Sequence, residues 1–181
     1  MILGPPDSVD AATRAFCATI APAEPFYVPV VPRARGRVAY CFQNSTYQAV
    51  AEGGDPAWGW AIWRWPGRWF EAEHHAVWRT PKGEYIDVTP QAGDPQRVLF
   101  LPDPQAVYDP RTYRANPMAP EPGNAAAAEY IALVARRNAI VRAYWRPCVD
   151  QLKLFSEEDC ARLAPIESRM AELLGELRLS S

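Results

Sequence analysis

The segment CFQNSTYQAVAE, residues 41–52, decides the fold, because GGDP at residues 53–56 ends it and strand-like sequence follows. The segment contains neither glycine nor proline, and Cys41, Asn44 and Gln48 fall at the spacing of one helical face. Glycine ends helices in the left-handed conformation, and proline cannot continue them. Residues 41–52 are therefore predicted to form a helix with Cys41 at its N-terminus.

Beyond this helix the sequence takes on the character of β-strands. Aromatic and β-branched residues fill three segments that PG and PKG turns separate, which predicts an antiparallel meander over 58–65, 69–79 and 84–89. A fourth short strand is predicted at 97–101. The proline-rich stretch 102–123 is expected to be irregular.

On the N-terminal side, residues 7–21 place apolar side chains at helical spacing, and Asp7 or Ser8 is positioned to cap the first turn. Residues 22–36 contain several prolines, each of which removes a backbone donor and disfavours helix before it. This second segment is therefore expected to be extended and partly β-like, with FYVPVVP at residues 26–32, and to wrap the surface.

Two more helices are predicted in the C-terminal part, 124–181. Asn124 caps the first, over residues 125–146, whose apolar face is expected to pack on the sheet. The second covers 156–178, and Pro165 either kinks it or divides it in two. These elements predict an α+β fold with a small antiparallel sheet of about four strands, packed against the cysteine-bearing helix and the C-terminal helices.

Composition excludes several classes of protein. The 181 residues suit a single domain, and 49% of them are hydrophobic, which is globular composition. A formal charge of -2 leaves no positive excess for phosphates, so nucleic acid is not expected as a partner. No signal peptide or membrane-spanning run is visible, and the four cysteines form no CxxC pair. We therefore expect a cytoplasmic protein with reduced thiols and no membrane partner.

Only two histidines are present, and both lie in the predicted strand 69–79. Successive side chains on a strand point to opposite faces, so either His74 or His75 can face the helix that carries Cys41. Such a histidine can take the proton of a thiol at a helix N-terminus, and Asp87 on the next strand can orient its ring. The chain thus predicts a cysteine–histidine–aspartate triad.

Further candidates surround this triad. Asn44 or Gln43, together with the amides of the first helical turn, are expected donors to an oxyanion, although Asn44 suits equally well the role of bonding a neighbouring loop. Most of the seven tryptophans fall at strand spacing and are expected in the core. Trp60 and Trp78 are the two expected to line a pocket.

The motifs themselves resemble those of transglutaminase-like and papain-like cysteine proteins. Residues 72–90 are similar to their His-Ala-x-Trp strand, glycine-containing turn and Asp-x-Thr, and read AEHHAVW, then RTPKGE, then YIDVTP. CFQN followed by GGDPAWGW resembles their cysteine helix and leading strand. Small bacterial and phage proteins share the Cys-x-x-Asn, Gly-Trp and His-Ala-x-Trp motifs. The similarity covers about residues 38–90, and it departs where family members carry tryptophan after the cysteine, since this chain has Phe42.

The resemblance implies a hydrolase or acyltransferase that acts on an amide, peptide or isopeptide bond of a protein or peptide-like substrate, without a cofactor. It selects His75, directly before Ala-x-Trp, as the base, with Cys41 as nucleophile and Asp87 as the orienting group; His74 takes a neighbouring role. Two alternatives stay open. One is a non-catalytic interaction protein on the same fold. The other is a zinc-dependent hydrolase, which is disfavoured because adjacent histidines on a strand diverge, so no metal is expected.

Overall fold

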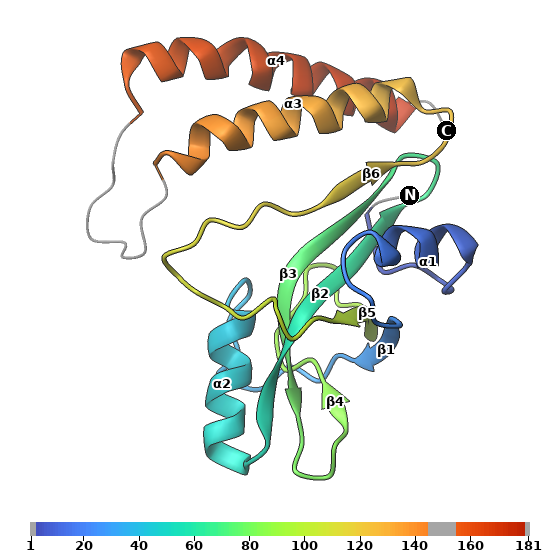
Figure 1. Cartoon of the computed structure of the whole chain (residues 1–181), viewed down its shortest axis with the longest axis vertical. Helices are drawn as coiled ribbons and strands as arrows, with labels where there is room; N and C mark the ends of the chain where they lie inside the picture. Colours follow the sequence, from blue (N-terminus) through green and yellow to red (C-terminus); the bar gives the residue numbers. More distant parts are fainter. Residues whose placement is uncertain (1–2, 145–154, 180–181) are drawn as a thin grey trace. The chain divides into compact units, whose positions relative to one another are not determined.

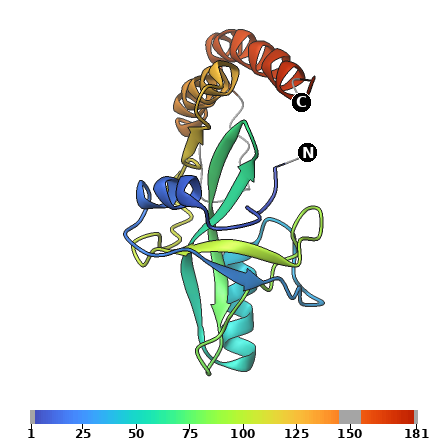
Figure 2. The same cartoon turned by 90° about the vertical axis from the view of Figure 1, so that its right-hand side faces the viewer.

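The structure is a computed structural model that describes residues 3–144 and 155–179 (Figures 1 and 2). It confirms the α+β class. The elements are, in chain order, α1 (Ala11–Ala18), β1 (Phe26–Pro29), α2 (Cys41–Glu52), β2 (Asp55–Trp65), β3 (Trp69–Arg79), β4 (Tyr85–Ile86), β5 (Arg97–Pro102), β6 (Met118–Pro120), α3 (Ala125–Arg142) and α4 (Glu157–Leu179).

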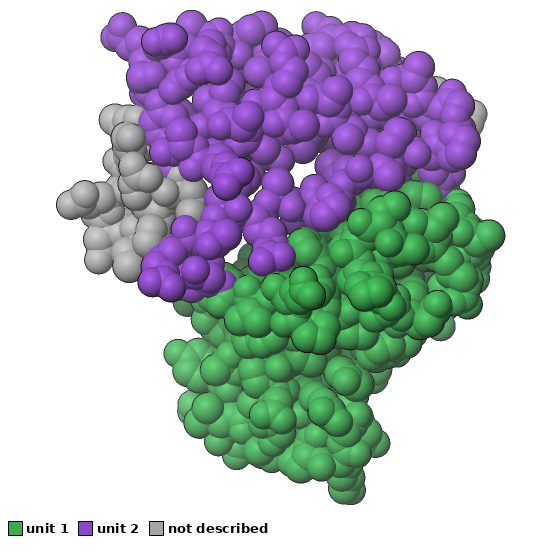
Figure 3. Space-filling model, in the orientation of Figure 1, with its two compact units in different colours: residues 1–65, 70–108 green, residues 66–69, 109–181 purple. Residues whose placement is uncertain are grey.

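The chain divides into two compact units, which Figure 3 shows in different colours. Unit 1 comprises residues 1–65 and 70–108, and unit 2 comprises residues 66–69 and 109–181. The expectation that residues 1–181 form one domain stays a prediction. All the predicted triad residues belong to unit 1.

The sheet follows the order β1-β5-β2-β3-β4, and β6 pairs with β3 outside this path. The predicted meander β2-β3-β4 is confirmed, and β5 inserts between β1 and β2 with antiparallel pairing on both sides. The strand β6 is one that the sequence did not predict, because it is short and lies within the proline-rich stretch.

A seam joins the two ends of this strand path. Val30 and Asp87 form a parallel bridge, in which the Val31 amide donates to the Asp87 carbonyl at 2.8 Å and the Asp87 amide donates to the Pro29 carbonyl at 3.0 Å. The strands of unit 1 therefore close into a ring, and Asp87 is one of the residues that close it.

The strand β1 corrects the expectation that residues 22–36 run over the surface. Val28 is fully buried and packs with Val77, Val98 and Phe100 in the core of unit 1. The prolines still allow this, because Pro29 stands at the end of the strand, where a missing backbone donor breaks little of the ladder.

The helix α2 begins at Cys41 and ends at Glu52, as predicted from the sequence. Gly53 and Gly54 follow it with φ of 78° and 81°, and a Cβ on Gly54 would lie 2.2 Å from the Arg79 carbonyl oxygen, so the turn requires glycine there. The helix lies alongside the β2–β3 hairpin (Figures 1 and 2), and the Ser45 hydroxyl donates to the Ala76 carbonyl at 3.0 Å. This contact fixes the helix against the strand that carries both histidines.

The first helix corrects the predicted cap. It begins after Asp10, whose carboxylate accepts a hydrogen bond from the Thr13 amide at 2.7 Å, whereas Asp7 and Ser8 lie before the helix. Arg64 on β2 donates to the same carboxylate at 2.8 Å. The hydrogen bonds from Thr13 have the largest effect, and together with the Arg64 guanidinium they lower the pKa of Asp10 to about 2. A distant charge partner, which no local pattern displays, favours this aspartate as the cap.

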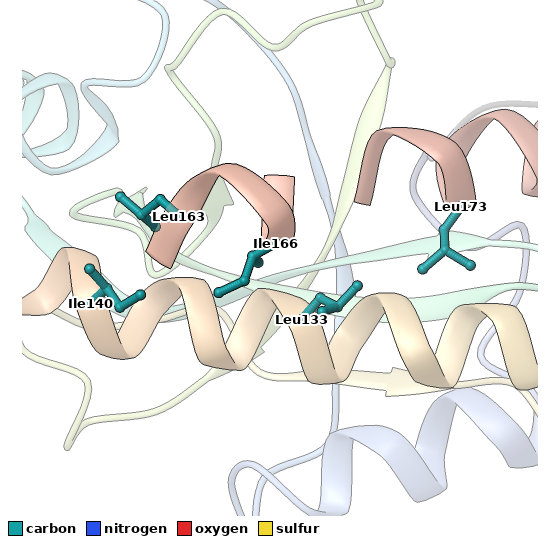
Figure 4. Close-up of a cluster of buried hydrophobic side chains, with 5 residues drawn as sticks. All are labelled: Leu133, Ile140, Leu163, Ile166 and Leu173. Atoms are coloured by element: carbon teal, nitrogen blue, oxygen red, sulfur yellow. The ribbon is translucent and has the colours of Figure 1, made fainter. Parts of the chain in front are cut away.

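In unit 2, α3 and α4 pack along each other. Asn124 caps α3 as predicted, accepting from the Ala127 amide at 2.8 Å. Leu133 and Ile140 of α3 pack on α4 (Figure 4). Helix α3 also contacts β6, and the ring of Tyr130 stacks on that of Trp69 in β3 with a centroid distance of 5.1 Å, so the predicted packing on the sheet is present in part. The helix α4 continues through Pro165 as one element, so the predicted division does not occur. Within the described residues, no helix combines the length and apolarity needed to cross a bilayer.

A substitution at Gly175 should stabilise unit 2. This glycine lies in the exposed interior of α4, and a Cβ there would meet no atom within 4 Å. Gly175→Ala is expected to raise the free energy of unfolding by about 0.5–1 kcal/mol, because alanine loses less backbone entropy in a helix. Urea denaturation measures the change. Gly54→Ala serves as the opposite case, since its positive φ and close carbonyl predict a loss of stability.

Candidate active site

Cys41 is the first residue of α2 and only 5% of its surface is exposed. The preceding Tyr40 makes no side-chain cap bond, and the first turn contains no acidic residue. The amides of a first turn have no partner within the helix, and they carry the positive end of its dipole. The thiol is therefore placed where backbone groups favour negative charge on sulfur or on a nearby oxygen.

The residue two positions before Cys41 is also unusual. Ala39 has a φ of 64°, in the left-handed region that residues with a Cβ seldom adopt. Hydrogen bonds from Asn44 hold this approach to the helix, because its amide nitrogen donates to the Arg37 carbonyl at 2.8 Å and its oxygen accepts from the Arg37 amide at 3.2 Å. The strained backbone and its anchor together fix how the chain enters α2.

His75 and Asp87 form a buried pair. The imidazole Nε2 donates to the Asp87 Oδ2 at 3.0 Å, and the exposed fractions of the two residues are 1% and 0%. Asp87 also accepts from the Thr89 amide at 2.9 Å and from the Gln91 side-chain amide at 2.8 Å. With its backbone in the ring seam and its carboxylate bonded on three sides, Asp87 has little freedom to move away from the imidazole.

The charge state of His75 follows from its neighbours. Burial, the largest single influence, lowers the pKa of His75, but the charge and hydrogen bond of Asp87 act in the opposite direction, and Cys41 adds to them. Together they hold the pKa of His75 well above its usual range. The surroundings of His75 therefore favour the protonated form of the imidazole.

Cys41 also influences the ring, since it raises the pKa of His75. Because Nε2 is bonded to Asp87, the second ring nitrogen, Nδ1, is the one available to the thiol. Nδ1 is buried and makes no hydrogen bond to any residue that the structure describes. The thiol is thus close enough to act on the imidazole without being aligned with it, a looseness common in catalytic hydrogen bonds before substrate binds.

No protein-family model, curated protein or solved structure matches this chain. In its own geometry, α2, β3 and the residue after β4 bring Cys41, His75 and Asp87 together.

His74 points away from this cluster. Its Nε2 donates to the Ala106 carbonyl at 2.6 Å, and its ring contacts those of Phe42 and Trp60 at centroid distances of 4.7 Å and 5.3 Å. The strand alternation thus assigns opposite surroundings to the two histidines. Within the described parts of the chain, no group of three His, Cys, Asp or Glu side chains is arranged to hold a metal ion.

An aromatic cluster covers the start of α2. The ring of Phe42 stacks on that of Tyr108 with a centroid distance of 4.1 Å, and the Trp58 ring lies 6.0 Å from the Phe42 ring, centroid to centroid. Phe42 and Tyr108 also line a shallow cavity of about 250 Å³ together with the exposed Gln43. The sequence did not single out Tyr108, and nothing in its local pattern distinguishes it from the residues around it.

The remaining predicted site residues are placed as follows. Asn44 donates to Thr89 Oγ1 at 3.2 Å as well as to the loop, so its amide is engaged within the chain, and of its two predicted roles the loop bond is the one present. The indole of Trp60 donates to Asp103 at 3.0 Å, and that of Trp78 donates to the Gly53 carbonyl at 2.8 Å, beyond the far end of α2. Gln43 is the predicted oxyanion donor whose side chain is exposed.

Gln91 is a residue that sequence reasoning missed. It fixes the carboxylate of Asp87 from four residues away, outside the predicted strand and inside no recognisable motif. Thr89 was visible within Asp-x-Thr, and the structure gives that pattern a physical role, because the Thr89 amide and hydroxyl tie Asp87 to Asn44. The spacing of two residues is the one at which an aspartate bonds a following amide.

Proposed function

We propose that this protein is a cysteine-nucleophile hydrolase or acyltransferase acting on an amide, peptide or isopeptide bond. The observation that carries the proposal is the buried His75–Asp87 pair with Cys41 beside the free face of the ring. A buried imidazolium is costly unless a charged partner holds it. Its position next to a thiol at a helix N-terminus is the arrangement that activates a cysteine.

In the first half of the proposed reaction, the Cys41 thiolate attacks the carbonyl carbon of the substrate. A C–S bond forms, and the carbonyl electron pair moves to oxygen, where first-turn amides of α2 and Gln43 stabilise the negative charge. The tetrahedral intermediate then collapses. His75 gives its Nδ1 proton to the leaving nitrogen, the C–N bond breaks, and a thioester on Cys41 and a neutral His75 remain.

In the second half, a water molecule or an acceptor amine attacks the thioester. Neutral His75 takes a proton from the attacking group, the new C–O or C–N bond forms, and the C–S bond breaks to release the Cys41 thiolate. Asp87 keeps its charge throughout and holds the ring so that Nδ1 faces the sulfur. Water gives hydrolysis or deamidation, and an amine gives acyl transfer.

Several features support a transglutaminase-like or papain-like core for unit 1. The cysteine begins a helix that packs on an antiparallel sheet, the histidine lies on a strand that this helix contacts, and Nε2 rather than Nδ1 bonds the carboxylate. Phe42 stands where the resemblance implies tryptophan, and it occupies an aromatic cluster as a tryptophan would. A protein or peptide-like substrate in the cytoplasm, without a cofactor, belongs to the same proposal.

Alkylation by iodoacetamide tests the proposal without a known substrate. Cys160 is exposed in the same chain and serves as an internal reference, whereas Cys41 is buried. At pH 6 an ordinary thiol with a pKa of about 8.5 is almost wholly protonated and reacts slowly. We expect Cys41 to be labelled at least about tenfold faster than Cys160 at this pH, as measured peptide by peptide with mass spectrometry.

The control variants separate activation from access. His75→Ala is expected to remove the excess reactivity of Cys41 at pH 6, while Asp55→Ala, which changes an exposed carboxylate in unit 1, should leave it unchanged. If Cys41 reacts no faster than Cys160 at pH 6, or if His75→Ala has no effect, the catalytic proposal is wrong.

The burial of the triad favours a second candidate function. Only 5% of Cys41 and 1% of His75 are exposed, which is the environment of a structural cluster as well as of a closed active site. In that case the protein binds a partner on the same fold without turnover. Slow, purely access-limited labelling of Cys41 at both pH 6 and pH 9 would support this function over the enzymatic one.

A further inference from the structure

A cavity of about 580 Å³ lies beside α2 and does not include any of the triad residues in its lining. Its walls come from the loop 33–36, from the face of α2 that carries Tyr47, Gln48 and Val50, and from Val88 after β4. All of these belong to unit 1. The cavity has the size of a small-molecule or dipeptide site.

Two buried donors in this lining lack partners. Gln48 is 8% exposed, and its Nε2 makes no hydrogen bond to any described residue. The Nε of Arg33 is buried in the same way, although its guanidinium lies 5.7 Å from the centre of the Trp78 ring and is held by it. A buried donor without a partner is unfavourable, so an acceptor that reaches both groups would recover free energy that the empty site loses.

The lining also restricts the chemistry of such an acceptor. Arg33 and Arg35 outnumber Glu52, which is the acidic side chain in the lining, so the site favours negative charge. The rest of the wall is largely apolar, with Val50 and Val88 prominent. A carboxylate accepts two hydrogen bonds in the plane that a guanidinium and an amide offer, and a hydrocarbon body next to it would cover the apolar wall. A compact, fully hydrated anion would use the donors but would leave the apolar wall uncovered.

We propose that this cavity binds a carboxylate attached to an apolar or peptide-like body, with Arg33 Nε and Gln48 Nε2 as its donors. The shared chemistry covers both a C-terminal carboxylate and an acidic side chain. Arg35 adds positive charge at the rim, and Tyr47 supplies an exposed aromatic wall. Asn44 shapes the site indirectly, because it holds the chain after the loop 33–36 to α2.

The position of the cavity gives it a role in the proposed reaction, and this step alone rests on the proposed function. Gln48 follows Cys41 by seven residues on the same helix, which is about 10 Å along the axis. An extended peptide covers about 3.3 Å per residue, so a carboxylate anchored at Gln48 lies about three residues from a group at Cys41. The cavity would then select substrates with a carboxylate at a fixed distance from the reacting bond.

A nuclear magnetic resonance titration tests the binding directly. The probes are N-acetyl-leucine, with an α-carboxylate, N-acetyl-glutamic acid α-amide, with a side-chain carboxylate, and the neutral N-acetyl-leucinamide. At least one carboxylate is expected to shift the side-chain amide resonances of Gln48 and to bind about tenfold or more tightly than the neutral amide. Which carboxylate binds more tightly identifies whether a chain end or an acidic side chain is the natural group.

Variants assign the effect to the two donors. Arg33→Met and Gln48→Leu keep the side-chain bulk but remove the donors, and each is expected to weaken carboxylate binding about tenfold. Arg79→Met, an exposed arginine outside the lining, is the matched control and should bind as wild type does. Removing an unpartnered buried donor should not unfold the protein, and circular dichroism checks this for each variant.

Several results would overturn the proposal. These are equal binding of N-acetyl-leucine and its amide, unchanged binding in both Arg33→Met and Gln48→Leu, or inorganic phosphate binding as tightly as either carboxylate. Iodoacetamide labelling of Cys41 at pH 6 is measured in the same two variants and is expected to be unchanged. Wild type that is labelled rapidly at Cys41 but binds no carboxylate would contradict this inference alone, and wild type that binds the carboxylate but is labelled slowly would contradict the proposed function alone.

Discussion

Asp87→Ala is expected to lower the free energy of unfolding by about 3–5 kcal/mol, as measured by urea denaturation. The substitution leaves the buried His75 without its charged partner and leaves the Thr89 amide and the Gln91 side chain without an acceptor. Removing one member of a buried hydrogen-bonded ion pair is among the most destabilising single changes, because the remaining group is desolvated without compensation.

Two further variants show which property of Asp87 matters. Asp87→Asn keeps an acceptor oxygen but no charge, so it is expected to cost less stability than alanine while still removing the rapid labelling of Cys41 at pH 6. Asp55→Ala, which alters an exposed carboxylate of β2, should stay within about 0.5 kcal/mol of wild type. A loss below about 1 kcal/mol for Asp87→Ala would mean that the pair is not held in the folded protein as described.

The second large effect concerns pH and is best measured in a Cys41→Ala background. There Asp87 remains to raise the pKa of His75, because its charge and hydrogen bond rank ahead of the influence of Cys41. A histidine in the unfolded chain has a pKa of about 6.5. Above that pH the folded protein therefore binds one more proton than the unfolded chain does, and its stability falls by about 1.4 kcal/mol per pH unit until His75 deprotonates.

The sign of this effect is specific. The stabilisation from His75 is fully present below about pH 6.5 and is lost as the pH rises through the raised pKa of the folded protein. The matched control is Cys41→Ala/His75→Gln, and the difference in unfolding free energy between the two proteins should shrink as the pH rises. Parallel curves, or a difference that grows with pH, would contradict a raised pKa for His75.

Restoring Cys41 should flatten this slope. Under the proposed function, a folded thiolate–imidazolium pair would contain one proton, as does the unfolded chain with a neutral imidazole and a protonated thiol between about pH 6.5 and 8.5. The difference in unfolding free energy between wild type and His75→Gln is therefore expected to depend less on pH than the same difference measured in the Cys41→Ala background. The comparison detects the ion pair through proton counting, independently of the alkylation measurement.

Much of the fold follows from local patterns. The helix over residues 41–52 was predicted to the residue, because Gly53 and Gly54 leave it no way to continue. The extended, partly β-like character of the segment that holds β1 was predicted, but its burial was not, because the prolines suggest exposure and the burial depends on pairing with β5, some 70 residues later. The contact of α3 with the sheet was predicted but its packing on α4 was not, since an apolar face does not state which surfaces it will meet.

The candidate site shows the same division between local and distant information. Strand alternation and the motif next to Ala-x-Trp placed His75 rather than His74 beside the predicted aspartate, and the structure brings these residues together. The bonds that hold Asp87 from Gln91, and the stacking of Phe42 on Tyr108, depend on chain segments with no sequence signature. Asn44 was left with two predicted roles, and only tertiary contacts decide between them.

The seam between Val30 and Asp87 has a consequence for self-association. Strands at a sheet edge carry unpaired backbone groups that recruit strands from other molecules. In this ring β1 has β5 on one side, and on the other its flank bonds to the chain at Asp87 and Val88. The Pro29 carbonyl of β1 and the amides of Val31 and Arg33 after it are therefore not left as a template for fibril growth, although the segment is short, apolar and close to the start of the chain.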